Sequence, residues 1–249
     1  MLPDNLNIPN LREPYSSAFS ACLEQLFSSY DIVGLLVTGT VVRGGGDVRS
    51  DLDIHVLHSE RFRERVQLRF NGVPCEIFVN PPDRVHGYFE EDRKDRRPIS
   101  PHMYATGVNV FDPFGTVEGL IADAMKILAD VPNAPSEASS TAMRYSAATE
   151  FEDVDDLAER DPAGAALLLG GAARKLAECR VALEPGWLPR AKDLLTRLQE
   201  VDPEAAALAE QAVSDAPFAT RMAAARELCV KVSGHDGFFE WTSPRESIP

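Results

Sequence analysis

The chain has 249 residues, of which 44% are hydrophobic and 26% charged, and its formal net charge is −14. The length predicts one or two globular domains. The acidic balance argues against a nucleic-acid partner, because binding a phosphate backbone requires clustered Lys and Arg. The four cysteines lack the paired short spacing of a zinc site. We expect neither a signal peptide nor a membrane-spanning segment, and therefore a cytoplasmic protein without a membrane partner; the oligomeric state is left open.

The first half of the chain predicts a small unit of helix and strands. Residues 16–29 place apolar side chains at helical spacing, and residues 32–38 form the apolar run of a strand covered on both faces. Residues 52–57 alternate between apolar and polar, as in a strand with one inward face. Asn71-Gly72 predicts a two-residue hairpin turn between residues 65–70 and 73–79, because this dipeptide supplies positive φ angles.

The second half predicts helices, several of which begin with proline in the first turn. A stretch with two prolines, residues 131–140, is the expected linker. The fold class expected is therefore α+β: a small mixed-sheet domain over residues 1–130, followed by an all-helical bundle domain over residues 131–249. The expected helices are residues 117–129, 137–159, 162–183, 189–199, 203–214 and 217–232.

Three acidic residues predict a metal site. Asp51 and Asp53 are two positions apart at the start of a predicted strand, so their carboxylates share one face. Carboxylates held this close repel each other, and a divalent cation relieves the repulsion. Glu76 stands among apolar neighbours in a nearby predicted strand and would complete the site. These residue types suit Mg²⁺, which binds carboxylates together with substrate phosphates.

The segment before these acids predicts a phosphate-binding turn. Gly39 and Thr40 directly follow a predicted buried strand, where a glycine allows a phosphate to approach the backbone and a hydroxyl can donate to its oxygens. Arg43 could add a charge-assisted contact. Together with the acids, this turn predicts a triphosphate held for in-line displacement at phosphorus.

The same residues resemble the signature of the DNA polymerase β-like nucleotidyltransferase superfamily. Its pattern of Gly-Ser/Thr, Arg-Gly, Asp-x-Asp and a later acid is matched by Gly39-Thr40, Arg43-Gly44, Ser50-Asp51-Leu52-Asp53 and Glu76. The spacing is most similar to minimal and aminoglycoside-type members, in which a helical domain follows a small nucleotidyltransferase domain.

This resemblance implies a metal-dependent transferase that moves a nucleotide to a hydroxyl and releases pyrophosphate, with Mg²⁺ as the cofactor and ATP as the expected donor. It implies Asp51 and Asp53 as metal ligands and Glu76 as either a ligand or the general base. The residues implied to bind the nucleotide are Gly39, Thr40, Arg43 and Ser50.

The acceptor is less determined by the sequence. An aminoglycoside-like antibiotic, and hence a role in antibiotic resistance, is the first expectation because the chain is acidic. Glu150 and Asp153 share a predicted helix face with Leu157, which would bring that side towards the protein and makes both residues substrate-binding candidates; we favour the alternative, an exposed acidic face. Lys192, near Trp187, is a further substrate-binding candidate. The alternatives for function are a protein adenylyltransferase of toxin–antitoxin type and a non-catalytic nucleotide-binding regulatory module.

The histidines receive structural interpretations. His55 is expected on the face opposite Asp51 and Asp53, as a packed or surface residue. His102 lies on an otherwise apolar segment and could line the substrate cleft, but we favour a packed histidine with a hydrogen-bond partner. The basic run at residues 93–97 is expected on a solvated face.

Overall fold

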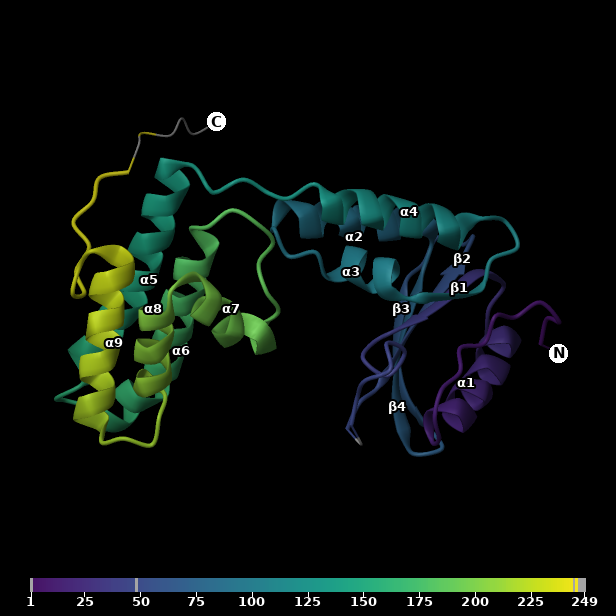
Figure 1. Cartoon of the computed structure of the whole chain (residues 1–249), viewed down its shortest axis with the longest axis horizontal. Coiled ribbons are helices and arrows are strands. Elements are labelled where there is room, and N and C mark those ends of the chain that lie inside the picture. Colours follow the sequence, from purple (N-terminus) through teal and green to yellow (C-terminus); the bar gives the residue numbers. More distant parts are fainter. Residues whose placement is uncertain (1, 48, 244, 246–249) are drawn as a thin grey trace. The chain divides into compact units, whose positions relative to one another are not determined.

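A computed structural model describes residues 2–47, 49–243 and 245 (Figure 1). The chain divides into two compact units, Met1–Val131 and Pro132–Pro249. The first contains a mixed five-stranded sheet with helices, and the described part of the second is helical, so the predicted α+β class is confirmed. Within the described ranges, none of the helices combines the length and the apolar character needed to cross a bilayer.

The sheet of the first unit has the strand order β3-β4-β2-β1-β5. Strand β2 pairs with β4 in parallel, and the other neighbours are antiparallel. The helices and strands of the first unit, in chain order, are α1 Tyr15–Ser29, β1 Ile32–Thr38, β2 Leu52–His58, β3 Glu64–Phe70, β4 Val73–Asn80, α2 Pro82–Lys94, α3 Ile99–Thr106, β5 Val108–Phe111 and α4 Thr116–Ala129.

The four longer strands and α1 begin and end within a residue of the predicted positions, whereas α2, α3 and β5 were not predicted. Helix α2 buries only Val85 and Phe89 among its many charged residues, so its sequence lacks a continuous apolar stripe. Strand β5 has only four residues, too few for a clear alternation.

The alternation of side chains divides the sheet into two faces. On one face, Ile54 and Val56 of β2 and Ile77 of β4 pack against α1. On the other, Leu57 packs with residues of α2, α3 and α4, including Phe89. Figure 1 shows α1 on one side of the sheet and these three helices on the other. Polar residues of β2 and β4 that alternate with the α1-facing residues therefore belong to the face of α2 and α3.

The second unit is a bundle around an alanine-rich core. Helix α5 begins at residue 137 as predicted, so the expected linker 131–140 overlaps its first residues; Ser136 caps the helix by accepting a hydrogen bond from the Ser139 N–H. The helix expected at 189–199 starts later, after a 3₁₀ turn. The elements are α5 Glu137–Leu157, α6 Pro162–Ala182, η1 Ala191–Asp193, α7 Leu194–Val201, α8 Pro203–Ala212 and α9 Phe218–Ser233.

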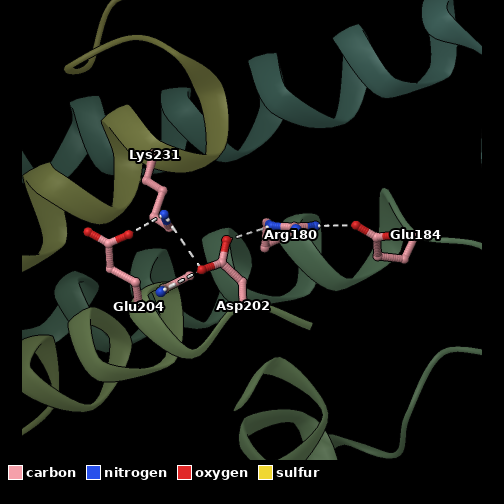
Figure 2. A network of polar contacts seen from close by, with 6 residues as sticks. Arg180, Glu184, Asp202, Glu204 and Lys231 are labelled. Atoms are coloured by element: carbon pink, nitrogen blue, oxygen red, sulfur yellow. Dashed lines mark hydrogen bonds and ion pairs between the residues drawn. The ribbon is translucent and has the colours of Figure 1, made fainter. Parts of the chain in front are cut away.

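Asp202 connects three helices of this bundle (Figure 2). Its carboxylate caps α8 by accepting from the Ala205 N–H at 3.0 Å. It also accepts from Arg180 of α6 at 2.9 Å and lies 3.6 Å from the Lys231 ammonium of α9. Burial by itself would raise the pKa of Asp202, but the hydrogen bonds from Ala205 and Arg180 and the charge of Lys231 lower it overall.

Candidate functional site

Three carboxylates converge on the sheet face of α2 and α3. Asp53 of β2 lies directly beside Glu76 of β4 in the parallel register, and Asp51 immediately precedes β2. One oxygen from each of these side chains lies within 4.8 Å of the others, and all three residues are half-buried. Among the residues that the structure describes, these three form the one group of acidic, histidine or cysteine side chains whose ligand atoms lie close enough together to hold a metal ion. Three carboxylate oxygens form a donor set that Mg²⁺ fits.

Asp53 is electrostatically disfavoured in its ionised form. Burial, followed by the charges of Asp51 and Glu76, raises the pKa of Asp53 from 3.8 to about 6, although Arg65 and Arg43 act in the opposite direction. A bound cation would remove this penalty, because it favours the ionised carboxylate.

Gly39 allows Asp53 to occupy its position. Its φ of +104° lies in the left-handed region, and a Cβ atom on this residue would lie 2.8 Å from Asp53 Oδ2. The glycine is thus required by the close approach of a carboxylate as well as by the backbone conformation. The predicted role of Gly39 in allowing a phosphate to approach the backbone stays a prediction.

The segment after Gly39 folds as a series of turns. The Gly44 N–H donates to the Val41 carbonyl and the Gly45 N–H to the Thr40 carbonyl, both at 3.0 Å. Thr40 is exposed, and the Arg43 guanidinium donates to Thr106 Oγ1 at 3.4 Å. Thr40 and Arg43 therefore lie on an accessible turn beside the acids.

Ser50 supports the loop that leads to the acids. Its hydroxyl accepts from the Asp47 N–H at 2.9 Å. The same loop is held from outside, because the Tyr15 hydroxyl donates to the Asp47 carbonyl and Arg12 to the Gly46 carbonyl, each at 2.6 Å. The contacts of Ser50 are those of a loop residue, and its expected role in nucleotide binding stays a prediction.

Two residues of β3 that were not predicted as site residues hold Glu76. Arg65 pairs with Glu76 Oε2 at 2.7 Å, and Gln67 donates to Oε1 at 3.0 Å. The hairpin turn could have identified them: it pairs Phe70 with Val73, and counting outward places Gln67 opposite Glu76. Arg65, two positions away, shares that face.

A cavity of about 440 Å³ adjoins the acids on the same face of the sheet. Asp53, Glu76 and Arg65 line it together with residues of α2 and α3, all from the first unit. His55 also lines it, so our expectation that His55 faces away from Asp53 is wrong. Residues two apart on a strand share a face, and His55 follows Asp53 by two.

His55 is part of an aromatic cluster. Its ring stacks on Phe78 with a centroid distance of 4.5 Å and meets Tyr104 edge-on at 4.9 Å. The Arg65 guanidinium lies 3.5 Å from the centroid of the Phe78 ring. Burial, assisted by the charge of Arg65, lowers the pKa of His55 to about 3, so this imidazole is neutral at physiological pH.

The substrate candidates of the second unit differ in their surroundings. Glu150 is half-buried, with the Lys175 ammonium 3.7 Å from its carboxylate, whereas Asp153 is exposed. The core side of α5 is formed by Phe151 and its neighbours, so Asp153 lies on an exposed face, in agreement with the favoured alternative, and its role in substrate binding stays a prediction. Lys192 is exposed in the 3₁₀ turn η1.

Two of the remaining predictions concern the first unit. His102 lies on α3 and is exposed, so the expectation of a packed histidine is wrong. Arg93, in the basic run, pairs with Asp130 at 2.5 Å and is half exposed, in agreement with a solvated face.

Comparison with solved structures found a likeness over most of the chain. A crystal structure of a nucleotidyltransferase-like protein from Exiguobacterium sibiricum 255-15 superimposes with a TM-score of 0.51 and 16% identity, covering 87% of this chain and 73% of that one. The two chains share a fold. Neither a model of a known protein family nor a curated protein matches this chain. This chain therefore shares the fold of that protein, and its chemistry follows from the residues of its own site.

Proposed function

We propose that this protein is a metal-dependent nucleotidyltransferase that moves a nucleotide, AMP from ATP, to a hydroxyl of a small molecule and releases pyrophosphate. The observation that carries the proposal is the convergence of Asp51, Asp53 and Glu76, whose oxygens lie within 4.8 Å of one another. The raised pKa of Asp53 supports it, because the carboxylate is poorly compensated until a cation binds. The nucleotidyltransferase-like fold agrees with this reaction class.

Each part of the site has a role in this proposal. Asp51 and Asp53 hold Mg²⁺ together with the donor phosphates, which neutralises charge at the reacting phosphate. The exposed turn with Thr40 and Arg43 binds the remaining phosphates through a hydroxyl, backbone N–H groups and a guanidinium. Glu76 is held in place by Arg65 and Gln67 and acts as a third ligand or as the base that takes the acceptor proton.

The proposal is tested by pyrophosphate release from ATP and Mg²⁺ with a panel of hydroxylated acceptors. The panel includes aminoglycosides, the acceptors expected from the acidity of the chain, and intact proteins, which test the adenylyltransferase alternative. Asp53→Asn should abolish release with the best acceptor, whereas Asp31→Asn, at an exposed aspartate outside the site, should not. Wild-type protein that fails to bind any nucleoside triphosphate with Mg²⁺ would refute the proposal.

Two further results separate the alternatives. Glu76→Gln weakens Mg²⁺ binding if Glu76 is a ligand; if it is the base, turnover falls while Mg²⁺ binding persists. A non-catalytic nucleotide-binding module would bind Mg²⁺–ATP without release under any condition, and its partner binding would survive Asp53→Asn.

A further inference from the structure

The cavity beside the acids is large enough for a second substrate. Its volume of about 440 Å³ lies within the range of small-molecule sites, roughly 300–1,000 Å³. Strands β2, β3 and β4 line it on one side and helices α2 and α3 on the other. Asp53 and Glu76 form part of its wall, so a molecule bound here would place a hydroxyl next to the proposed metal site.

The cavity and the proposed phosphate-binding turn lie on different sides of the acids. The turn follows β1, which flanks β2 on one side, whereas Glu76 lies on β4, which flanks β2 on the other. The residues that the structure describes between Gly39 and Ser50 do not line the cavity. In-line displacement at phosphorus places the attacking oxygen opposite the leaving pyrophosphate. A triphosphate bound at the turn would thus be attacked from the side of the cavity.

The lining of the cavity is mainly apolar, with a few polar groups. Its apolar part includes Phe78, Ile99 and Met103. Two lining residues carry buried polar atoms without a hydrogen-bond partner: His55 Nε2, in a residue 5% exposed, and the Tyr104 hydroxyl, in a residue 1% exposed. Because these two atoms are closed off from the cavity as well as from bulk solvent, a ligand's polar atoms would instead meet the partly exposed polar residues of the lining, Tyr88 and Ser100.

The charges of the lining argue against a polycation. Its carboxylates are Asp53 and Glu76, both part of the proposed metal site, and Arg65 already pairs with Glu76 at 2.7 Å. An aminosugar with several ammonium groups would meet a guanidinium and find no other carboxylate in this wall. A neutral molecule avoids both problems.

From these observations we infer that the cavity is the acceptor site, and that it takes an uncharged, hydroxylated molecule with an apolar ring, of about the size of an aryl glycoside. This inference rests on the proposed function. In the reaction, a bond forms between the acceptor oxygen and the α-phosphorus, the bond from that phosphorus to the bridging oxygen breaks, and pyrophosphate leaves. The proton of the acceptor hydroxyl passes to a carboxylate of the cluster.

Binding is tested without ATP, by calorimetry with three probes: phenyl β-D-glucoside, methyl β-D-glucoside and kanamycin, a polycationic aminosugar. We expect the phenyl glucoside to bind at least tenfold more tightly than the methyl glucoside, and kanamycin more weakly than either. Met103→Trp fills the cavity and should lower the affinity for the phenyl glucoside at least tenfold. Met125→Trp, on α4 at a position 59% exposed and outside the lining, is the matched control. Should Met103→Trp fail to fold, Ile99→Trp replaces it, because Ile99 is 56% exposed and lines the cavity.

The inference is overturned if neither glucoside binds, if both tryptophan variants of the cavity bind the phenyl glucoside as wild type does, or if kanamycin binds most tightly and loses affinity in Met103→Trp. Pyrophosphate release and Mg²⁺–ATP binding are measured in parallel. Glucoside binding in a protein that does not bind Mg²⁺–ATP would refute the proposed function and leave the cavity as a ligand site. Release with acceptors whose affinity Met103→Trp does not change would refute the inference alone.

Discussion

Replacing Asp53 by asparagine should stabilise the metal-free protein. The ionised carboxylate of Asp53 is disfavoured by burial and by the charges of Asp51 and Glu76, which raise its pKa from 3.8 to about 6. The folded state thus binds a proton more tightly than the unfolded state does. The free energy of unfolding falls as the pH rises from about 4 to about 6, and the penalty is complete above the folded-state pKa.

The size of the effect follows from this pKa. Each pKa unit corresponds to about 1.4 kcal/mol, so ionised Asp53 lowers the free energy of unfolding by about 3 kcal/mol at pH 8. Because Asp53 is only half-buried and solvent screens part of the repulsion, we expect Asp53→Asn to recover about 1–3 kcal/mol. At about 3 °C for each kcal/mol, the melting temperature of the first unit would rise by about 3–9 °C.

The assay is thermal and urea unfolding in EDTA at pH 4 and pH 8, followed by circular dichroism. The difference between Asp53→Asn and wild type should be present at pH 8 and nearly absent at pH 4. Adding Mg²⁺ should stabilise the wild type and leave the variant almost unchanged, since only the wild type has the full set of ligands. Asp31→Asn, at an exposed aspartate, controls for the general effect of removing one negative charge.

Two outcomes would show that this reasoning is wrong. One is a variant that is less stable than wild type at pH 8 in EDTA. The other is a stabilisation of equal size at pH 4 and pH 8, because an effect of the ionised carboxylate must disappear when the group is protonated.

Three other substitutions test individual contacts, two inside the first unit and one inside the second. Gly39→Ala places a Cβ 2.8 Å from Asp53 Oδ2 at a φ of +104°, and we expect a loss of about 1–3 kcal/mol in urea unfolding with weaker Mg²⁺ binding by calorimetry. Arg65→Met removes a charge that lowers the pKa of Asp53, so the pH midpoint of Mg²⁺ binding should move upward in calorimetric titrations between pH 5 and 8. Asp202→Ala removes the cap of α8 and the ion pair with Arg180, which should lower the free energy of unfolding of the second unit by about 1–3 kcal/mol. Because the folded state lowers the pKa of Asp202, this contribution is complete above the unfolded-state pKa and is lost as the pH falls through the folded-state pKa.

Each of these substitutions has a matched control. Gly44→Ala introduces similar backbone strain, at a φ of +81°, but its Cβ meets nothing within 4 Å, so Mg²⁺ binding should persist. Arg65→Lys keeps the positive charge and should keep the pH midpoint near that of wild type. Glu204→Gln removes an ion pair of Lys231 at a side chain 77% exposed, and should leave the stability of the second unit nearly unchanged. If a control changes as much as its partner, the contact assigned to that partner does not explain the effect.

The features that the sequence predicted well depend on local physics. Strand β1 has the predicted bounds, because a continuous apolar run between polar segments favours a buried strand. The turn at Asn71 and Gly72 has the expected positive φ angles, 48° and 84°. The two-residue period of a strand also places His55 and Asp53 on one face, so the sequence was sufficient to predict this arrangement. The expectation that His55 faces away from Asp53 misapplied that period.

The features that only the tertiary structure decided depend on contacts between distant segments. Parallel pairing of β2 with β4 places Asp53 beside Glu76, and no local pattern specifies which strands become neighbours. Helix α2 was not predicted, because Val85 and Phe89 are its only buried residues and most of the others are charged or polar. The pKa of Asp53 and the cavity beside it follow from desolvation and packing, which arise when the sheet and the helices that cover it come together. The sequence by itself thus determined which side chains could do the chemistry, and the tertiary structure determined that they meet, because proximity and burial are properties of the assembled fold.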